Sequence, residues 1–399
     1  RLGTSTHLMP LYAHLGTQLK RHCGGWRAGV LTSDPELGHA LGMRADQQDK
    51  LFNGAIPCVL YGFAIHQNSE AKRASLSTDT NGASRSIASG PEQMFVNRLH
   101  KNLRHLKKWR EQQDIHCFRA YDADLREYNV AVDLYEDWAV LQEYQAPDSV
   151  DTTKAQQRLR AVVTSLPEAL GISPSRVILK VRARQGRSFR YTAETENRQF
   201  LEVREGDLRF LVNFTDTIDT GLFLDHRLTR QWLRERAQGQ RFLNLFGYTG
   251  TASVAAAKGG ATATTTVDLS PRFLEWSDRN LALNGFHGNE HRLQRSDCLE
   301  WLKRGRGDYE LIFLDPPTFS HSKRAHDFAV QRDHLELIRL TMQRLAPEGV
   351  LLFTNHFRQF KLEPELLDEF AVENLHPHTV PKDFSRTPKV HWAWAFRHR

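Results

Sequence analysis

The chain has 399 residues, which is enough for two or three domains with a sizeable hydrophobic core. Lys and Arg (54) outnumber Asp and Glu (47), and the resulting formal net charge of +7 favours a polyanionic partner. Four widely spaced cysteines without a C-x-x-C pair argue against a zinc site or a disulfide framework, so we expect no metal and a reducing compartment. No apolar run reaches the roughly 18 residues of a membrane span, and the first residues have no signal-peptide pattern. We therefore expect a cytoplasmic protein without a membrane partner.

Residues 1–67 contain two strand-like runs, over 26–33 and 50–65, around a predicted helix over 35–41. Asn53-Gly54 is a strong hairpin signal. We expect these strands to lack partner strands of their own, so the segment is either the end of a preceding domain or an independent small module. Residues 68–90 are rich in Ser, Thr, Ala, Asn and Gly without apolar periodicity, which predicts a flexible linker.

An α+β domain is predicted over residues 91–213. It opens with a helix whose apolar residues recur at helical spacing from Val96 to Trp109, while Lys and Arg fill its other faces for solvation or RNA contact. Strands over 117–144, a helix over 151–170, a strand over 176–184 and a β-rich connection over 200–213 follow.

The strand over 176–184 alternates between an apolar face and a cationic face. A row of cations on one face of a sheet can bind successive phosphates, and we favour this role over that of a solvated face. The domain is therefore interpreted as a substrate-positioning domain, with candidate RNA-binding residues Lys180, Arg182, Arg184 and Arg187.

The region over 214–399 is predicted to be the catalytic domain. A short apolar run, 242–246, is followed by a turn through Gly247 and Gly250 and then by an Ala-rich helix over 252–258. Glycines allow a backbone to approach a ligand closely, and the helix that follows presents unpaired N–H groups at the carboxyl end of the strand.

Three acids follow three further strand-like runs: Asp268, Asp297 and Asp315, the last within Asp315-Pro316-Pro317. Carboxyl ends of parallel strands meet at one edge of a sheet, so these acids converge with Gly250. A dinucleotide fold would require G-x-G-x-x-G, whereas this turn reads GYTGTA and lacks the third glycine. S-adenosylmethionine has a ribose and no phosphate, so the whole set favours it as the cofactor; an ordinary α/β core with acidic strand ends is the alternative.

A helix over 331–345, a fifth strand over 349–356, a helix over 363–373 and a terminal pair of strands over 378–399 complete the chain. The predicted fold class is thus α/β, a Rossmann-like methyltransferase sheet with a closing antiparallel hairpin, preceded by the small α+β domain.

Several motifs carry a specific resemblance: NLFGYTGTA, TTTVDLS, RNLALNG, SDCLEWL, LIFLDPPTFSHSKR and, upstream, DTGLFLDHR. They resemble the second methyltransferase of the bacterial fused 23S rRNA guanine methyltransferases, the RlmK half of the RlmKL family, and more distantly the RlmI-like rRNA methyltransferases. The resemblance covers essentially the whole chain. It implies that residues 1–67 are the end of a first methyltransferase whose own motifs precede residue 1.

The resemblance also implies a substrate and a set of site residues. The partner would be 23S rRNA or a large-subunit precursor, with the methyl group going from S-adenosylmethionine to guanine N7. Asp268 is assigned to the ribose, Asp297 to the adenine amino group and the 246–250 turn to the methionine portion, with a lid in the FLDHR loop. The full cofactor set is Phe223, Asp225, Arg227, Asn244, Phe246, Tyr248, Thr249, Gly250, Asp268, Ser270, Asp297 and Asp315.

Methyl transfer is an in-line displacement, so the protein chiefly has to hold the acceptor near attack distance. The predicted catalytic residues are Asp315, Pro316, Pro317 and Phe319, where the prolines stiffen the turn and Phe319 stacks on a base. Lys323 and Arg324 are candidates for phosphate contact. A proton-free acceptor such as guanine N7 needs no general base, so His226 is not assigned that role.

Three alternatives stay open. Cytosine C5 methylation needs a thiolate nucleophile, but neither DPPTFS nor FTNHF contains cysteine, and Cys298 lies on the adenine side. Methylation of the exocyclic guanine N2 is separated from N7 only by the resemblance. A third possibility is an RNA-binding scaffold with a degenerate methyltransferase domain, which the intact motifs disfavour.

Overall fold

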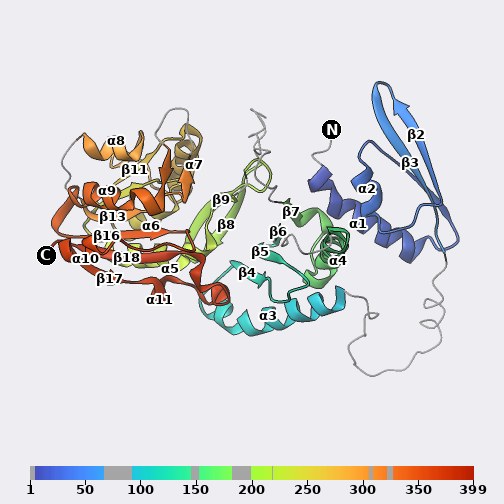
Figure 1. The fold of residues 1–399 in the computed structure, drawn as a ribbon, viewed down its shortest axis with the longest axis horizontal. Helices are drawn as coiled ribbons and strands as arrows, with labels where there is room; N and C mark the ends of the chain where they lie inside the picture. The colour runs from blue at the N-terminus through green and yellow to red at the C-terminus, as the bar shows by residue number, and fades with distance from the viewer. Residues whose placement is uncertain are drawn as a thin grey trace. The chain divides into compact units, whose positions relative to one another are not determined.

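The computed structural model describes residues 5–66, 92–144, 152–181, 199–217, 219–304, 309–320 and 327–399 (Figure 1). The chain divides into two compact units: Arg1–Trp109 with Arg119–Arg190, and Arg110–Phe118 with Tyr191–Arg399. This division groups residues 200–213 with the second unit, whereas the sequence suggested a boundary at 213. The predicted linker over 68–90 lies outside the described residues, as do five of the predicted RNA-binding cations: Arg182, Arg184, Arg187, Lys323 and Arg324.

The first unit begins with a small layer of helices and strands. Its elements are α1 (Ser5–His22), β1 (Arg27–Thr32), α2 (Pro35–Ala40), β2 (Gln47–Asn53) and β3 (Ile56–Ala64). The predicted hairpin forms between Asn53 and Ile56, and β1 then pairs antiparallel with the other edge of β3. The expectation that these strands lack partners was therefore wrong: they pair with one another in the order β1-β3-β2. The helix α1 was not predicted.

The rest of the first unit contains the predicted α+β elements. These are α3 (Glu92–Gln112), β4 (Cys117–Asp122), β5 (Val130–Tyr135), β6 (Trp138–Glu143), α4 (Thr152–Leu170), a 3₁₀ turn (Pro174–Arg176) and β7 (Val177–Val181). The last residues of α3 and the first of β4 belong to the second unit. The strands form one sheet in the order β4-β5-β6-β7, in which β7 joins β6 in parallel.

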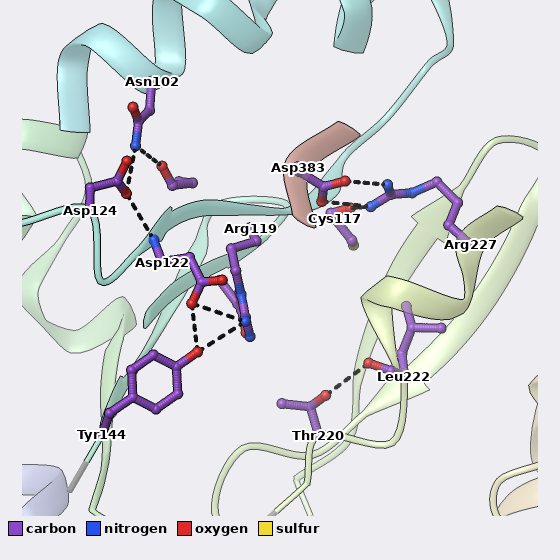
Figure 2. A network of polar contacts seen from close by, with 12 residues as sticks. Asn102, Cys117, Arg119, Asp122, Asp124, Tyr144, Thr220, Leu222, Arg227 and Asp383 are labelled. Atoms are coloured by element: carbon purple, nitrogen blue, oxygen red, sulfur yellow. Dashed lines mark hydrogen bonds and ion pairs between the residues drawn. The ribbon is translucent and has the colours of Figure 1, made fainter. Parts of the chain in front are cut away.

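A buried polar network holds this sheet together (Figure 2). Arg119 donates two hydrogen bonds to Asp133, at 2.7 and 2.9 Å, and the Tyr144 hydroxyl donates to Asp122 at 2.6 Å. Because its charge is paired with Asp133, the Arg119 guanidinium costs less free energy to bury than an isolated charge would.

The second unit is built on a seven-stranded sheet (Figure 1). Its strands, in chain order, are β10 (Arg241–Leu245), β11 (Ala263–Asp268), β12 (His291–Arg295), β13 (Tyr309–Leu314), β16 (Leu345–Asn355), β17 (Ala371–Asn374) and β18 (Trp392–Arg397). They are ordered β12-β11-β10-β13-β16-β18-β17. The first five run parallel, and β18 pairs antiparallel with both β16 and β17.

Helices and short strands connect this sheet. They are β8 (Leu201–Glu205), β9 (Leu208–Val212), α5 (Arg227–Arg236), α6 (Thr251–Lys258), α7 (Pro271–Leu283), α8 (Cys298–Lys303), β14 (Phe319–Ser320), β15 (Phe328–Ala329), α9 (Val330–Met342), α10 (Glu365–Glu369) and α11 (His376–Thr379). Three 3₁₀ turns cover Leu224–His226, Lys382–Phe384 and Pro388–Val390.

The central strands are apolar on both faces because helices cover both faces of a parallel sheet. Alternate residues of β10 show this directly: Leu243 and Leu245 pack in one core cluster and Phe242 in another. The sheet therefore sits between two hydrophobic layers and holds the carboxyl ends of its strands in a fixed arrangement.

The predicted fold class is confirmed, with a correction at the carboxyl end. The helix predicted over 363–373 is shorter, spanning Glu365–Glu369, and β17 follows it at once. The closing antiparallel pair is formed by β17 and β18, and not by two strands within 378–399. Among the described residues, no helix is both long and apolar enough to cross a membrane.

Candidate active site

A cavity of about 840 Å³ opens at the carboxyl ends of the parallel strands. In open α/β sheets this edge is where ligands bind. The cavity is lined from five successive strand ends, which contribute Phe246 and Tyr248 after β10, Asp268 from β11, Asp297 after β12, Asp315 to Pro317 after β13, and His356 after β16.

The glycine turn after β10 is tightly wound. Phe246, Tyr248 and Gly250 have positive φ values of 55°, 48° and 72°. A Cβ on Gly250 would lie 1.9 Å from Ser277 Oγ and 2.7 Å from Ser277 Cβ, so the turn and α7 can approach this closely only with glycine at 250.

Asp268 anchors this turn. Its Oδ2 accepts a hydrogen bond from Tyr248 N at 2.9 Å, and its Oδ1 accepts one from Ser270 N at 2.8 Å. Burial raises the pKa of the carboxyl, while these backbone hydrogen bonds oppose the rise. A carboxylate has about four lone-pair sites, so Asp268, which lines the cavity, can still accept a hydrogen bond from a ligand.

The other cofactor residues predicted from the sequence divide into two groups. Asp297 lines the cavity and also caps α8, accepting a hydrogen bond from Glu300 N at 3.1 Å. Ser270 caps α7, while Asn244 donates to Ser253 Oγ at 3.0 Å and Thr249 donates to Gly221 O at 2.6 Å. Asn244 and Thr249 therefore hold the turn by hydrogen bonds within the protein and do not line the main cavity.

The predicted residues of the FLDHR loop also differ in whether they line the cavity. Phe223 lines the cavity, but Asp225 and Arg227 are buried away from it. Arg227 donates to Asp383 Oδ1 at 2.9 Å and to Cys117 O at 2.6 Å (Figure 2). Its guanidinium thus links α5 to two distant segments of the same unit, and the structure gives it no contact with the cavity.

Asp315 is hydrogen-bonded within the protein. Thr354 Oγ1 donates to its Oδ1 at 2.7 Å, and His226 Nε2 lies 3.3 Å from its Oδ2. Burial would raise the pKa of this carboxyl, but His226, His356 and Thr354 outweigh burial and lower the pKa to about 2. Asp315 is therefore ionised at neutral pH.

A histidine cluster beside Asp315 was not predicted. Asp225 Oδ2 lies 3.1 Å from His356 Nε2 and 2.9 Å from His391 Nδ1, and His391 Nε2 lies 3.1 Å from Thr379 Oγ1. Asp225 lies in the 3₁₀ turn before α5, His356 directly follows β16, His391 directly precedes β18, and Thr379 ends α11. Because the histidines are isolated in the sequence, no spacing pattern could have identified the cluster.

The members of this cluster differ in charge. Burial lowers the pKa of His391 to about 4, so His391 is neutral. Burial also acts to lower the pKa of His356, but Asp225 and Asp315 outweigh it and raise the pKa to about 9. Asp225, His226 and His356 each offer one atom within a 4.8 Å group that could hold a metal ion. In this structure the carboxylate of Asp225 instead accepts hydrogen bonds from His356 and His391.

The turn after β13 presents a flat aromatic surface. Pro316, Pro317 and Phe319 line the cavity, and Phe319 is 63% exposed, with its ring 6.1 Å from that of Phe357. Cys298 also lines the cavity, but burial raises the pKa of its thiol well above the usual value. The Cys298 thiol lies 3.7 Å from Val267 O and accepts from Phe246 N, so it is a packed thiol and not an activated nucleophile.

The residues of this cavity fit an adenosyl cofactor. A side chain at Gly247 would come within 2.3 Å of Thr266 Cγ2, so the turn can pack this closely against β11 only with glycine at 247. Asp268 can supply acceptors for neighbouring hydroxyls, and the ring centroids of Tyr248 and Phe273 lie 4.6 Å apart in an edge-to-face contact. A glycine turn followed by an acid at a strand end can bind a ribose, but it does not form a phosphate-binding loop.

Comparison with known proteins gives the same result. A family model described as S-adenosylmethionine-dependent methyltransferase matches residues 123–388. Relatives named ribosomal RNA large subunit methyltransferase K/L include those of Ectopseudomonas mendocina, 48% identical over 100% of this chain and 56% of that protein, and Pseudomonas aeruginosa, 48% identical over 99% and 55%. The chain thus spans about 56% of the length of the curated relatives it matches.

The fold has counterparts among solved structures. The structure of SMU.776 complexed with SAH is 21% identical, with a TM-score of 0.62 over 88% of this chain and 87% of that chain. A second structure, from Streptococcus mutans, has a TM-score of 0.61 at the same identity over 88% and 91%. The sheet order, the strand-end cavity and the family match over residues 123–388 together lead to one conclusion: this chain belongs to the S-adenosylmethionine-dependent methyltransferases.

Proposed function

We propose that this chain transfers a methyl group from S-adenosylmethionine to N7 of a guanine in 23S rRNA. The relatives that are 48% identical are named as large-subunit ribosomal RNA methyltransferases, which supports the class of substrate. The excess of basic residues, with a net charge of +7, is consistent with a nucleic-acid partner.

The cofactor, when bound, supplies an electrophilic methyl group, and the chain's residues orient the two reactants. We assign Asp268 to the ribose hydroxyls, Asp297 to the adenine amino group, and Phe246 and Tyr248 to the methionine portion. Their positions around the 840 Å³ cavity support these roles. Phe223 is assigned to cover the cofactor, because its ring lies 5.3 Å from that of Tyr248.

The choice of N7 over an exocyclic amine rests on the resemblance carried by the LIFLDPPTFSHSKR motif, and Asp315 by itself does not decide it. In an exocyclic amine reaction, the acid of the DPP turn would accept the amino hydrogens of the substrate. Here its two oxygens face Thr354 and His226 within 3.3 Å, and the carboxylate keeps further lone pairs. Guanine N7 presents an in-plane lone pair without a proton, so this acceptor needs positioning alone.

Phe319 and the prolines are assigned to position the base. Base stacking on an exposed aromatic ring contributes about 1–3 kcal/mol, and Phe319 is the exposed ring at the turn. Of the cysteines in the described part of the chain, Cys298 alone lines the cavity, and its raised pKa disfavours cytosine C5 chemistry. We further propose that the α+β part of the first unit binds RNA through the cationic face that includes Lys180.

The test is methylation of unmodified 23S rRNA transcripts with labelled S-adenosylmethionine, followed by mass spectrometry of the nucleosides. We expect 7-methylguanosine, and we expect it to disappear when the transcripts contain 7-deazaguanosine, which lacks N7. N2-methylguanosine or 5-methylcytidine would overturn the base assignment and keep the cofactor. Cofactor binding without any product would favour a scaffold, or a requirement for the remainder of the longer relatives.

A further inference from the structure

The walls of the cavity carry more acidic than basic side chains. The acids are Asp219, Asp268, Asp297, Glu300 and Asp315, and the basic side chains are Lys303 and His356. A surface with this excess of carboxylates repels the phosphates of a nucleic acid, whereas it does not repel a neutral base. Under the proposed function, the target guanine therefore enters the cavity while the phosphates on either side of it stay outside.

The loop after β16 brings an aromatic and a cationic side chain to the edge of this cavity. Phe357 follows His356, which lines the cavity, and the Phe357 ring lies 6.1 Å from the ring of Phe319 at an interplanar angle of 70°. Phe357 does not itself line the cavity, and Arg358, the next residue, is exposed. The loop thus continues the aromatic surface of Phe319 beyond the cavity.

Trp392 brings a second cation to this loop. Its indole Nε1 donates to Phe357 O at 3.2 Å, and Lys389 Nζ lies 5.8 Å from the centre of its ring. Lys389 is exposed, and neither Lys389 nor Arg358 forms an ion pair within the described part of the chain. We call Phe357, Arg358 and Lys389 the rim surface.

The angle between the two phenylalanine rings determines how bases can stack on them. Rings at 70° cannot hold one base between them, because a sandwiched base needs two parallel faces. Each ring can instead support a base of its own. A base that has left its stack no longer lies parallel to its neighbour, so the pair suits a target base on Phe319 and an adjacent base on Phe357.

We propose that the rim surface binds the nucleotide next to the target guanine, with its base stacked on Phe357 and the adjoining phosphates in contact with Arg358 and Lys389. This inference rests on the proposed function, which supplies the RNA substrate. N7 of a paired guanine lies in the deep, narrow major groove of an RNA helix, which side chains cannot read. We therefore expect the rim surface to bind an unpaired strand. Trp392 is a positioning residue, because it holds the loop.

The experiment measures the affinity of the full chain for RNA with and without the rim cations. The probe is a fluorescent RNA oligonucleotide that contains guanine, used as a single strand and annealed to its complement. The rim variant combines Arg358→Gln with Lys389→Gln. The matched control combines Arg292→Gln with Arg304→Gln, which removes the same charge from exposed residues in β12 and directly after α8, at the edge of the sheet remote from β16 and β18.

We expect the rim variant to bind the single strand about tenfold more weakly at about 0.1 M salt, because two phosphate contacts are lost. The slope of log affinity against log salt concentration should become shallower by about 1.4, or about 0.7 for each contact. The control variant should change both values less. Phe357→Leu, which keeps an apolar side chain, should weaken single-strand binding by about 5- to 100-fold through lost stacking and leave the salt slope unchanged.

Three results would overturn the inference: equal losses in the rim and control variants, equal losses for the single strand and the duplex in the rim variant, or wild-type affinity in Phe357→Leu. None of them touches the proposed function as long as the transcripts still yield 7-methylguanosine. Conversely, wild-type protein that binds the probe as expected but forms no 7-methylguanosine overturns the proposed function and not the rim surface. Calorimetry with S-adenosylmethionine checks that each variant is folded, and if Phe357→Leu is not, the two exposed charge variants decide.

Discussion

Replacing Gly250 with alanine is the sharpest test of the glycine turn. A non-glycine residue at φ 72° costs about 1–2 kcal/mol in backbone strain. The added Cβ would also lie 1.9 Å from Ser277 Oγ, 2.7 Å from Ser277 Cβ and 3.1 Å from Ser277 Cα. Rotating the hydroxyl away relieves only the first contact, so α7 or the turn has to move. Overpacking of this kind costs about 1–3 kcal/mol, and the free energy of unfolding should therefore fall by about 2–5 kcal/mol.

A matched control separates strain from overpacking. Gly285 has a φ of 81°, and a Cβ built on it meets nothing within 4 Å. Gly285→Ala should therefore lose only the strain component, about 1–2 kcal/mol. Chemical denaturation of both variants gives the difference, which we expect to be at least 1 kcal/mol.

The same displacement should weaken cofactor binding. The turn carries Tyr248, which lines the cavity and whose backbone N–H donates to Asp268 at 2.9 Å. A shift of the turn therefore moves the Tyr248 side chain and also disturbs the Asp268 carboxylate. We expect Gly250→Ala to raise the dissociation constant for S-adenosylmethionine at least about tenfold by calorimetry, since losing one hydrogen bond of a buried pair costs about 1–3 kcal/mol. Gly285→Ala should bind normally. Equal stability and equal affinity in the two variants would refute the argument from close approach.

Three further changes test other parts of the structure. Asp268→Ala should sharply weaken S-adenosylmethionine binding, and an unchanged affinity by calorimetry would remove the ribose assignment. Asp383→Ala should lower the free energy of unfolding by about 3 kcal/mol, because it removes the carboxylate that lies 2.9 Å from the buried Arg227 guanidinium. Glu310→Ala, which breaks a more exposed pair with Arg241, should cost less than about 1 kcal/mol, so similar losses would contradict the role of burial. Finally, the pKa of His356 is raised to about 9. The positive charge of His356 therefore stabilises the fold fully below the unfolded pKa of about 6.5. This stabilisation is lost as the pH rises toward 9. The denaturation midpoint should therefore fall over this range in wild type, and a fall of the same size in Asp225→Asn would count against the pairing.

Local patterns explain what could be predicted. The turn at 247–250 and the acids after β11, β12 and β13 depend on neighbouring residues, because a glycine break and an apolar run specify a strand end locally. The closing strands were harder to predict. Ala371 to Asn374 follow a helical pattern in the sequence, yet form β17 because β18 offers an unpaired edge. Tertiary pairing of this kind overrides weak local preference.

The same distinction between local pattern and tertiary contact applies to the site residues. The sequence placed Arg227 beside the cofactor, but its guanidinium is bound by Asp383, 156 residues away, since a buried cation must find a carboxylate wherever the fold supplies one. His356 and His391 meet Asp225 from positions more than 130 residues distant. By itself the sequence determined the methyltransferase sheet and the acids at its edge, because these arise from short-range periodicity. Only the tertiary structure decided which charges are paired and which glycine must stay small, because these depend on distances between segments that no local pattern encodes.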